Sequence, residues 1–198
     1  MDLHELIEAC HEAAAGEDPA LEVADLLGGF LRQRDLSTLV GTGDRSIFEA
    51  VHRSDDLLLL HAVIPPIPAP VDPHNHRMWA VVGVYQGQED TQLFTRTDDD
   101  TLEPTERFSV APGDVRALDV SAIHSIQPGR GEYLGALHIY GGDLLATPRS
   151  SWRGGIERPY DETAVLRLFD GIRRHEDELG RPMTADETAT LLAATTTT

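Results

Sequence analysis

Two histidines separated by a single residue, His74 and His76, are the side chains of this sequence with the clearest capacity for chemistry. On an extended chain such residues point the same way, about 6.5–7 Å apart. Imidazole nitrogens at that spacing can converge on one metal ion, with bonds of about 2.0–2.1 Å in zinc sites. A third ligand must come from elsewhere, and His124 follows a tight turn, Pro112-Gly113-Asp114, that begins a new strand. The sequence therefore predicts a metal site of three neutral imidazoles, His74, His76 and His124.

The segments that would position these histidines have the pattern of an all-β domain. Between residues 46 and 140, short apolar runs are separated by clusters of Gly, Pro and Asp, which is typical of a sandwich or barrel. We therefore expect an antiparallel β-barrel or jelly roll. The expected strands are Ser46–His52, Leu57–Ile64, Met78–Tyr85, Gln92–Thr97, Glu106–Val110, Val115–Leu118, Ile123–Ile126 and Tyr133–Tyr140.

Helical periodicity flanks this β region on both sides. Apolar residues at helical spacing predict helices in the first 40 residues, with a break at Gly16-Glu17-Asp18-Pro19. The same periodicity returns in Glu162–His175 and Thr184–Ala193. We expect these helices to cap the β core.

Charge and composition exclude several classes of function. The chain has 34 acidic residues against 16 basic ones, all of them arginine, and a formal net charge of −18. Such a surface repels nucleic acids and anionic membranes, so neither is an expected partner. Cys10 is the single cysteine, which excludes an internal disulfide, and the first residues lack the basic region of a signal peptide. We therefore expect a cytoplasmic protein, while its oligomeric state stays open.

The spacing of the histidines resembles the two metal motifs of the cupin superfamily. The first motif corresponds to His74-x-His76 with Gly87, and the second to Pro112-Gly113-Asp114 with His124. The resemblance covers about residues 65 to 145. It implies a single cupin domain over residues 1–198, with a cupin-type antiparallel β-barrel (a double-stranded β-helix or jelly roll) at 46–145. Helices at 1–40 and 160–194 would flank the barrel.

A further segment, Leu137-His138-Ile139-Tyr140, resembles the Ser-x-His-x-Tyr signature of the cysteine dioxygenase-like branch of the cupins, the thiol dioxygenases. Two positions depart from the family. Ala136 replaces the serine of the signature. Ala80 stands where many cupins place a glutamate ligand, and where some cysteine dioxygenases have a cysteine crosslinked to the tyrosine. The site would therefore hold its metal with three histidines and no carboxylate.

The resemblance implies a non-haem Fe(II) dioxygenase that adds O₂ to a small thiol and releases a sulfinic acid. Tyr140 would hydrogen-bond the oxygen species, and His138 would orient Tyr140. Two arginines are candidates for gripping a substrate carboxylate, Arg53 and Arg149, since a guanidinium binds carboxylates with two hydrogen bonds. Arg149 resembles in placement the arginine that 3-mercaptopropionate dioxygenases use. Trp79 lies close enough to the histidine pair to form a wall of the pocket.

Other interpretations of the same residues stay open. Three histidines could hold Zn, Ni or Mn instead and support hydrolysis, isomerisation or dioxygenation of a compound without sulfur. A cupin that only binds a small ligand is a third possibility, favoured by the two alanines. His138 and Tyr140 could be core residues of a strand, and Arg53 and Arg149 could be partners in surface ion pairs. The sequence does not identify the substrate.

Overall fold

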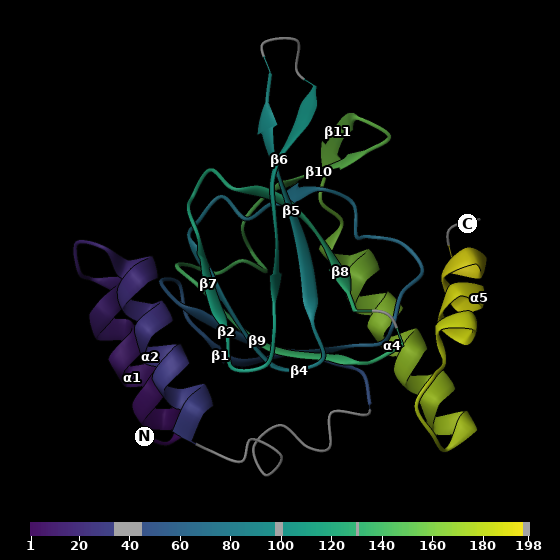
Figure 1. Cartoon of the computed structure of the whole chain (residues 1–198), viewed down its shortest axis with the longest axis horizontal. Helices are drawn as coiled ribbons and strands as arrows, with labels where there is room; N and C mark the ends of the chain where they lie inside the picture. Colours follow the sequence, from purple (N-terminus) through teal and green to yellow (C-terminus); the bar gives the residue numbers. More distant parts are fainter. Residues whose placement is uncertain (34–44, 98–100, 130, 196–198) are drawn as a thin grey trace.

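The computed structural model describes residues 1–33, 45–97, 101–129 and 131–195 (Figure 1). Its helices are α1 (Leu3–Ala14), α2 (Pro19–Gln33), α4 (Glu162–Leu179) and α5 (Ala185–Thr195). Its strands are β1 (Ile47–Arg53), β2 (Leu58–Ile64), β3 (His74–Asn75), β4 (Ala80–Gln86), β5 (Glu89–Arg96), β6 (Leu102–Val110), β7 (Val115–Leu118), β8 (Ile123–Pro128), β9 (Leu134–Tyr140), β10 (Ser150–Arg153) and β11 (Ile156–Pro159).

The strands form two antiparallel sheets with the topology of a jelly roll. One sheet has the order β1-β2-β9-β4-β7, and the other has the order β11-β10-β3-β8-β5-β6. Strands β2 to β9 thus alternate between the sheets as 2-9-4-7 and 3-8-5-6, the order that defines the eight-stranded jelly roll or double-stranded β-helix. The predicted fold class, an antiparallel β core with helices at both ends, is confirmed.

Apolar residues fill both faces of the sheet that contains β2. Alternation along β2 sends Leu58 and Leu60 into a cluster between the two sheets, where they pack with Tyr140. Leu59 points the other way, into a cluster shared with α1 and α2. These two helices cover the outer face of the sheet, on the left in Figure 1, and α4 and α5 lie on the opposite side. The helices thus lie outside the sandwich, and the predicted site lies between the sheets.

Some predicted boundaries differ from those observed. Strand β6 begins at Leu102 and not at Glu106, because its exposed polar half belongs to a hairpin with β5 that projects away from the sandwich (Figure 1). Strands β3, β10 and β11 were not expected. Helix α4 extends to Leu179, where Gly180 ends it in the left-handed conformation (φ 64°). The helical expectation for residues 34–40 lies outside the described residues.

No helix within the described ranges has the combined length and apolar character needed to span a membrane.

Gly87, which belongs to the first cupin-like motif, is expected to tolerate no side chain. Its φ is +68°, and a Cβ there would lie 2.4 Å from the carbonyl oxygen of Tyr133. Gly87→Ala should therefore lower the free energy of unfolding by more than about 2 kcal/mol, since left-handed backbone alone costs roughly 1–2 kcal/mol. Urea unfolding measures this. Gly113→Ala is the matched control, because φ is +90° there but no atom lies within 4 Å of the added carbon. A loss equal to that of the control would contradict the steric argument.

Candidate metal centre

The three predicted ligands lie together between the sheets. His74 on β3 is the direct cross-strand partner of His124 on β8, and His76 follows one residue after β3 ends. One ring nitrogen from each histidine lies within 4.8 Å of the others. The exposed fractions of the three residues are 7%, 5% and 6% in chain order. The structure therefore brings together the residues that the sequence predicted, in a group that could hold a metal ion.

Strand β3 is only two residues long, and its neighbours hold it in place. On one side it pairs with β8, and on the other with β10, through the register Ser151 to His74. The amide of Ser150 also donates to the Asn75 side chain oxygen (2.9 Å), and the amide of Trp152 donates to the Pro73 carbonyl (2.8 Å). The residue between the two histidines thus faces away from the metal group and anchors the segment.

The imidazoles are neutral at physiological pH. Burial lowers the pKa of His74 to about 4. Burial, reinforced by the neighbouring histidines and by Arg149, holds the pKa of His76 and of His124 well below the usual range. A metal ligand must carry a free lone pair, and a neutral imidazole has one. The three rings therefore carry the free lone pairs that metal ligands need.

A hydrogen bond leaves Nε2 of His74 free, and a close approach joins the Nε2 atoms of the other two histidines. Nδ1 of His74 donates to the Asp72 carbonyl (3.0 Å), which leaves Nε2 with the lone pair. The Nε2 atoms of His76 and His124 lie 3.2 Å apart, a separation that two ligands of one ion can adopt. In the described part of the chain, Nδ1 of His76 and of His124 has no hydrogen-bond partner. The buried donor set thus fits a metal ion.

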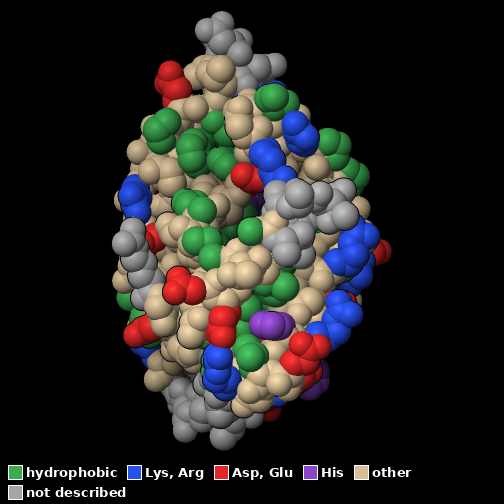
Figure 2. All heavy atoms as spheres, turned by 90° about the vertical axis from the view of Figure 1, so that its right-hand side faces the viewer, with side chains coloured by type: hydrophobic (Ala, Val, Ile, Leu, Met, Phe, Trp, Pro, Cys, Tyr) green, Lys and Arg blue, Asp and Glu red, His purple; other side chains and the backbone are tan. Residues whose placement is uncertain are grey.

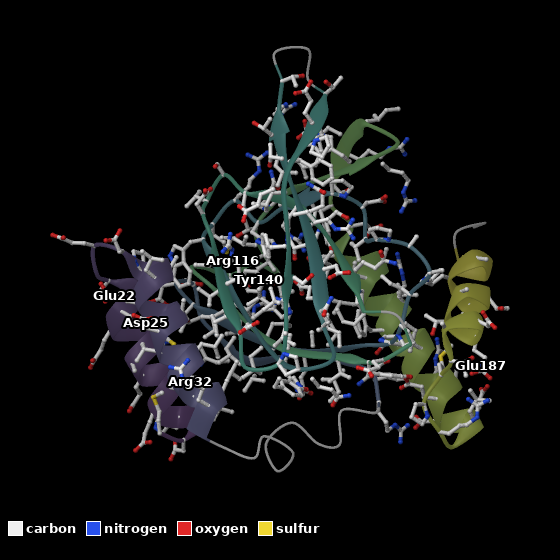
Figure 3. The ribbon with its side chains drawn as sticks, viewed as in Figure 1. Glu22, Asp25, Arg32, Arg116, Tyr140 and Glu187 are labelled. Atoms are coloured by element: carbon white, nitrogen blue, oxygen red, sulfur yellow. The ribbon has the colours of Figure 1, made fainter. Side chains whose placement is uncertain are left out.

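Tyr140 and His138 lie beside this group on the inner face of β9. The Tyr140 ring is 5.1 Å from the His76 ring, centroid to centroid, and Figure 3 shows Tyr140 between the sheets. The rings of His138 and Tyr140 stack at 6.2 Å, with 7° between their planes. Burial raises the pKa of the Tyr140 phenol and lowers that of His138 to about 4. Tyr140 is thus a hydroxyl donor, and His138 is a neutral ring.

Ala80 is the cross-strand neighbour of Tyr140, so no carboxylate or thiol stands at this position. Its side chain belongs to the apolar cluster between the sheets, together with Leu118. At the position of Ala80, the inside of the sandwich therefore has an apolar methyl group in place of a possible ligand.

Arg149 is the cation whose charge lowers the pKa of each of the three histidines. Its side chain is 4% exposed, and its Nη2 donates to Oε2 of Glu162 at 2.5 Å. Its guanidinium carbon lies 3.3 Å from the centroid of the Tyr160 ring. Nε and Nη1 are buried and have no acceptor among the residues that the structure describes. A buried guanidinium with two donor nitrogens that lack an acceptor, near enough to lower the pKa of three imidazoles, can bind an anion there.

Tyr160 and Glu162, which hold Arg149, were missed by the sequence interpretation. The signal that could have found Tyr160 is Gly154-Gly155, a two-residue hairpin turn in which both φ angles are positive, 61° and 79°. The hairpin of β10 and β11 returns the chain so that the Tyr160 amide donates to the Arg149 carbonyl (2.9 Å). Tyr160 also contacts His74, with ring centroids 5.5 Å apart.

Two further predicted substrate residues lie elsewhere. Trp79 packs with the cluster under α1 and α2, since alternation turns it outward while Met78 and Ala80 point inward. The prediction that Trp79 forms a wall of the site is therefore wrong. Arg53 is half exposed, and its Nε and Nη2 donate to the Asp143 carboxylate at 2.8–3.0 Å. Arg149, and not Arg53, is thus the arginine whose charge lowers the pKa values of the three histidines.

Glu89 is a buried carboxyl inside the sandwich that the sequence did not reveal. It is 1% exposed; the Thr91 hydroxyl donates to its Oε1 (3.0 Å), and Oε2 has no partner in the described ranges. Burial raises the pKa of Glu89 to about 7. The folded state therefore binds this proton more tightly than the unfolded state, where the pKa is about 4.3.

The contribution of Glu89 to the free energy of unfolding is expected to fall as the pH rises from about 4.5 through 7. In this range the carboxyl ionises readily in the unfolded chain, whereas burial makes its ionisation unfavourable in the folded protein. Glu89→Gln removes that charge. Its effect on the free energy of unfolding should be more favourable at pH 8 than at pH 5, by about 3 kcal/mol. Urea unfolding of both proteins at both pH values measures the difference. An effect that is equal at pH 5 and pH 8 would contradict the raised pKa.

Comparisons with known proteins concern the fold. No family model matches the sequence, and no curated protein matches it. Among solved structures, the chain is similar to an RmlC-like cupin family protein with a double-stranded β-helix fold from Methanocaldococcus jannaschii. The TM-score is 0.41 and the identity 13%, over 51% of this chain and 84% of that one.

Two other solved structures are similar to the same extent. One is a cupin superfamily protein from Desulfitobacterium hafniense, with a TM-score of 0.39 and 17% identity over 50% of this chain and 79% of that one. The other is hydroquinone 1,2-dioxygenase from Sphingomonas sp. TTNP3, with a TM-score of 0.41 and 12% identity over 55% of this chain and 72% of that one.

Proposed function

We propose that this protein is a non-haem Fe(II)-dependent dioxygenase that converts a small thiol carrying a carboxylate into a sulfinic acid. The overall change, RSH + O₂ → RSO₂H, balances in atoms and electrons, because sulfur is oxidised by the four electrons that O₂ accepts. The observation that supports the proposal is the closeness of Arg149 to three buried neutral imidazoles, whose pKa values it lowers. Arg149 is buried, and its Nε and Nη1 have no acceptor among the described residues.

His74, His76 and His124 would hold the iron. Because none of the three carries a charge, the ion would keep its full positive charge and favour an anionic thiolate over a thiol. When bound, the metal supplies a common site for the sulfur and for O₂. The hydrogen bond from His74 to the Asp72 carbonyl fixes the orientation of one ligand ring.

Arg149 would bind the substrate carboxylate through Nε and Nη1. Glu162 and Tyr160 hold the guanidinium from the other side, so little conformational freedom is lost when the substrate binds. The side chain lies near enough to His74, His76 and His124 to lower the pKa of each. A short mercapto acid could therefore span from the arginine to the metal group. Figure 2 shows a hollow on the face that bears α4 and α5, which would give such a molecule a route inward.

Tyr140 would donate a hydrogen bond to oxygen in the site. Its phenol stays protonated because burial raises its pKa. The His138 ring, stacked parallel to Tyr140, restricts where the phenol can move. Tyr140 lies beside His76 and His138 lies beside Tyr140, and neither would be a metal ligand.

Oxygen uptake by the Fe(II)-loaded protein tests the proposal. The protein is purified without air, loaded with Fe(II), and supplied with 3-mercaptopropionate, cysteine or cysteamine, of which only cysteamine lacks a carboxylate. We expect thiol-dependent uptake of one O₂ per thiol and a sulfinic acid product by mass spectrometry, with cysteamine the poorest substrate. The same protein loaded with zinc is the control and should consume no O₂.

The alternatives correspond to other outcomes of this experiment. Tight zinc, nickel or manganese binding without thiol-dependent uptake would favour a Lewis-acid enzyme on the same histidines, because imidazole suits all of these metals. Silence with every thiol, together with thermal stabilisation by a thiol acid, would favour a binding protein. The cytoplasm is the compartment we propose, since thiols are kept reduced there.

A further inference from the structure

A second pair of imidazoles meets on the outside of the protein, far along the chain from the first. His11 lies in the last turn of α1, and His52 lies on β1. Their Nε2 atoms are 2.9 Å apart, and their rings are perpendicular, with centroids at 5.0 Å. Asp56, in the turn between β1 and β2, has its Oδ2 atom 3.3 Å from Nδ1 of His11. Three elements thus bring two histidines and a carboxylate to one place.

The hydrogen-bond pattern directs a lone pair of His11 toward His52. A carboxylate only accepts hydrogen bonds, so Nδ1 of His11 carries the proton that Asp56 receives. Nε2 of His11 therefore has a lone pair that points at Nε2 of His52. The Ser54 hydroxyl donates to Oδ1 of Asp56 (2.7 Å) and fixes the carboxylate. A histidine that binds a metal through Nε2 commonly has a carboxylate on Nδ1 in this way.

The distance between the two Nε2 atoms also suits a shared ion. Two nitrogens bound at about 2.05 Å lie about 2.9 Å apart at a right angle and about 3.3 Å apart at the tetrahedral angle of zinc, so a small rotation of the rings fits the pair to either geometry. The observed distance is 2.9 Å.

We propose that His11 and His52 bind a divalent transition-metal ion on the surface, with Asp56 orienting His11. The site is independent of the proposed dioxygenase centre and would be the weaker of the two, because it offers two protein ligands and water. Both histidines are partly exposed, so an ion can reach them. A bound ion would link α1 to the β1–β2 hairpin and so stabilise the folded state.

Equilibrium dialysis against zinc, with metal analysis, tests this site separately from the buried one. In a His76→Ala background we expect one zinc per chain to remain. His52→Ala or His11→Ala in that background should remove it. His4→Ala is the matched control, because His4 also lies on α1 beside a carboxylate, Glu8, but has no second imidazole within its described contacts. This control should keep the zinc.

Thermal unfolding with and without zinc gives a second measurement, made on the chain with all other residues intact. Zinc should raise the Tm of the His4→Ala protein more than that of His52→Ala. Asp56→Asn should weaken zinc binding by roughly 10- to 100-fold, the usual loss when the partner of a ligating histidine is removed. The proposal is overturned if His52→Ala holds as much zinc as His4→Ala. It is also overturned if His52→Ala lowers the Tm equally with and without zinc, since the pair would then be only a hydrogen bond.

Discussion

Replacing His76 by alanine is expected to abolish iron binding at the buried centre and, with it, thiol-dependent O₂ uptake. His76 is 5% exposed and lies between the other two histidines and Tyr140, so no other described side chain can take its place. Removing a group that merely orients a ligand costs roughly 10- to 100-fold in metal affinity. Loss of the ligand itself should exceed that, and iron content should fall from about one per chain to nearly none.

The size of the effect follows from what the substitution leaves behind. Two imidazoles, His74 and His124, remain as cross-strand partners, and two neutral nitrogens hold an ion far less well than three. The deleted ring also leaves a cavity of about its own volume, which water can enter because polar nitrogens line it. Added imidazole fits that cavity and should restore part of the iron content and part of the O₂ uptake.

The matched control is His138→Ala. This histidine also lies on the inner face of the sandwich and also has a pKa lowered by burial, to about 4, but it is not in the three-histidine group. We expect this variant to keep its iron while its O₂ uptake falls. Metal analysis after gel filtration and an oxygen electrode provide both readouts. Full iron occupancy in His76→Ala, with circular dichroism unchanged, would show that the ligand assignment is wrong.

Much of the fold was accessible from the sequence because apolar runs of strand length stand between Gly, Pro and Asp clusters. Strand β7, Val115–Leu118, was predicted with the bounds observed. Strand β5 begins at Glu89, earlier than the predicted Gln92. The prediction missed this start because Glu89 is buried although a carboxyl residue is usually exposed. Strand β3 is two residues long and exists only through its neighbours β8 and β10, so no local pattern could reveal it.

The three-histidine group could be predicted for a different reason: only one of its members comes from a distant part of the chain. His74 and His76 are fixed relative to each other by the local chain, and only His124 had to arrive from elsewhere. The arginine site depends on more. Arg149 becomes a binding residue only because the β10–β11 hairpin returns Tyr160 to it and α4 begins with Glu162 beside it. Those contacts are tertiary, and the sequence alone left Arg149 equivalent to Arg53.

Removing the charges of Arg149 and Glu162 together is expected to weaken the use of carboxylate-bearing thiols selectively. Hydrogen bonds to charged groups contribute about 1.5–3 kcal/mol each, and 1.4 kcal/mol corresponds to tenfold. An amide can still donate one of the two proposed hydrogen bonds, so the double variant Arg149→Gln/Glu162→Gln should lose one bond, or roughly 10- to 150-fold in kcat/KM for 3-mercaptopropionate, chiefly through KM. Its kcat/KM for cysteamine, which has no carboxylate, should stay nearly unchanged.

Both charges are removed because Arg149→Gln alone would leave a partly buried carboxylate without its cation. The Glu162 side chain is 19% exposed, its Oε2 bonds Arg149, and Oε1 has no partner in the described ranges. Removing one member of a buried ion pair costs about 3–5 kcal/mol, which is enough to unfold a marginally stable domain. Neutralising both members avoids this penalty, so a loss of activity can be assigned to substrate binding and not to unfolding.

Arg53→Gln separates the two arginines that the sequence left as candidates. Arg53 also forms an ion pair, with Asp143, but its side chain is 48% exposed and points its N–H groups at that carboxylate. We expect kcat/KM for 3-mercaptopropionate to stay within about twofold of the unchanged protein, since exposed ion pairs contribute only roughly 0–1 kcal/mol. A selective loss in Arg53→Gln, with none in the double variant, would transfer the carboxylate site to Arg53. Equal losses for 3-mercaptopropionate and cysteamine in the double variant would instead show that Arg149 shapes the site without binding a carboxylate, because only a bound carboxylate makes the two thiols differ.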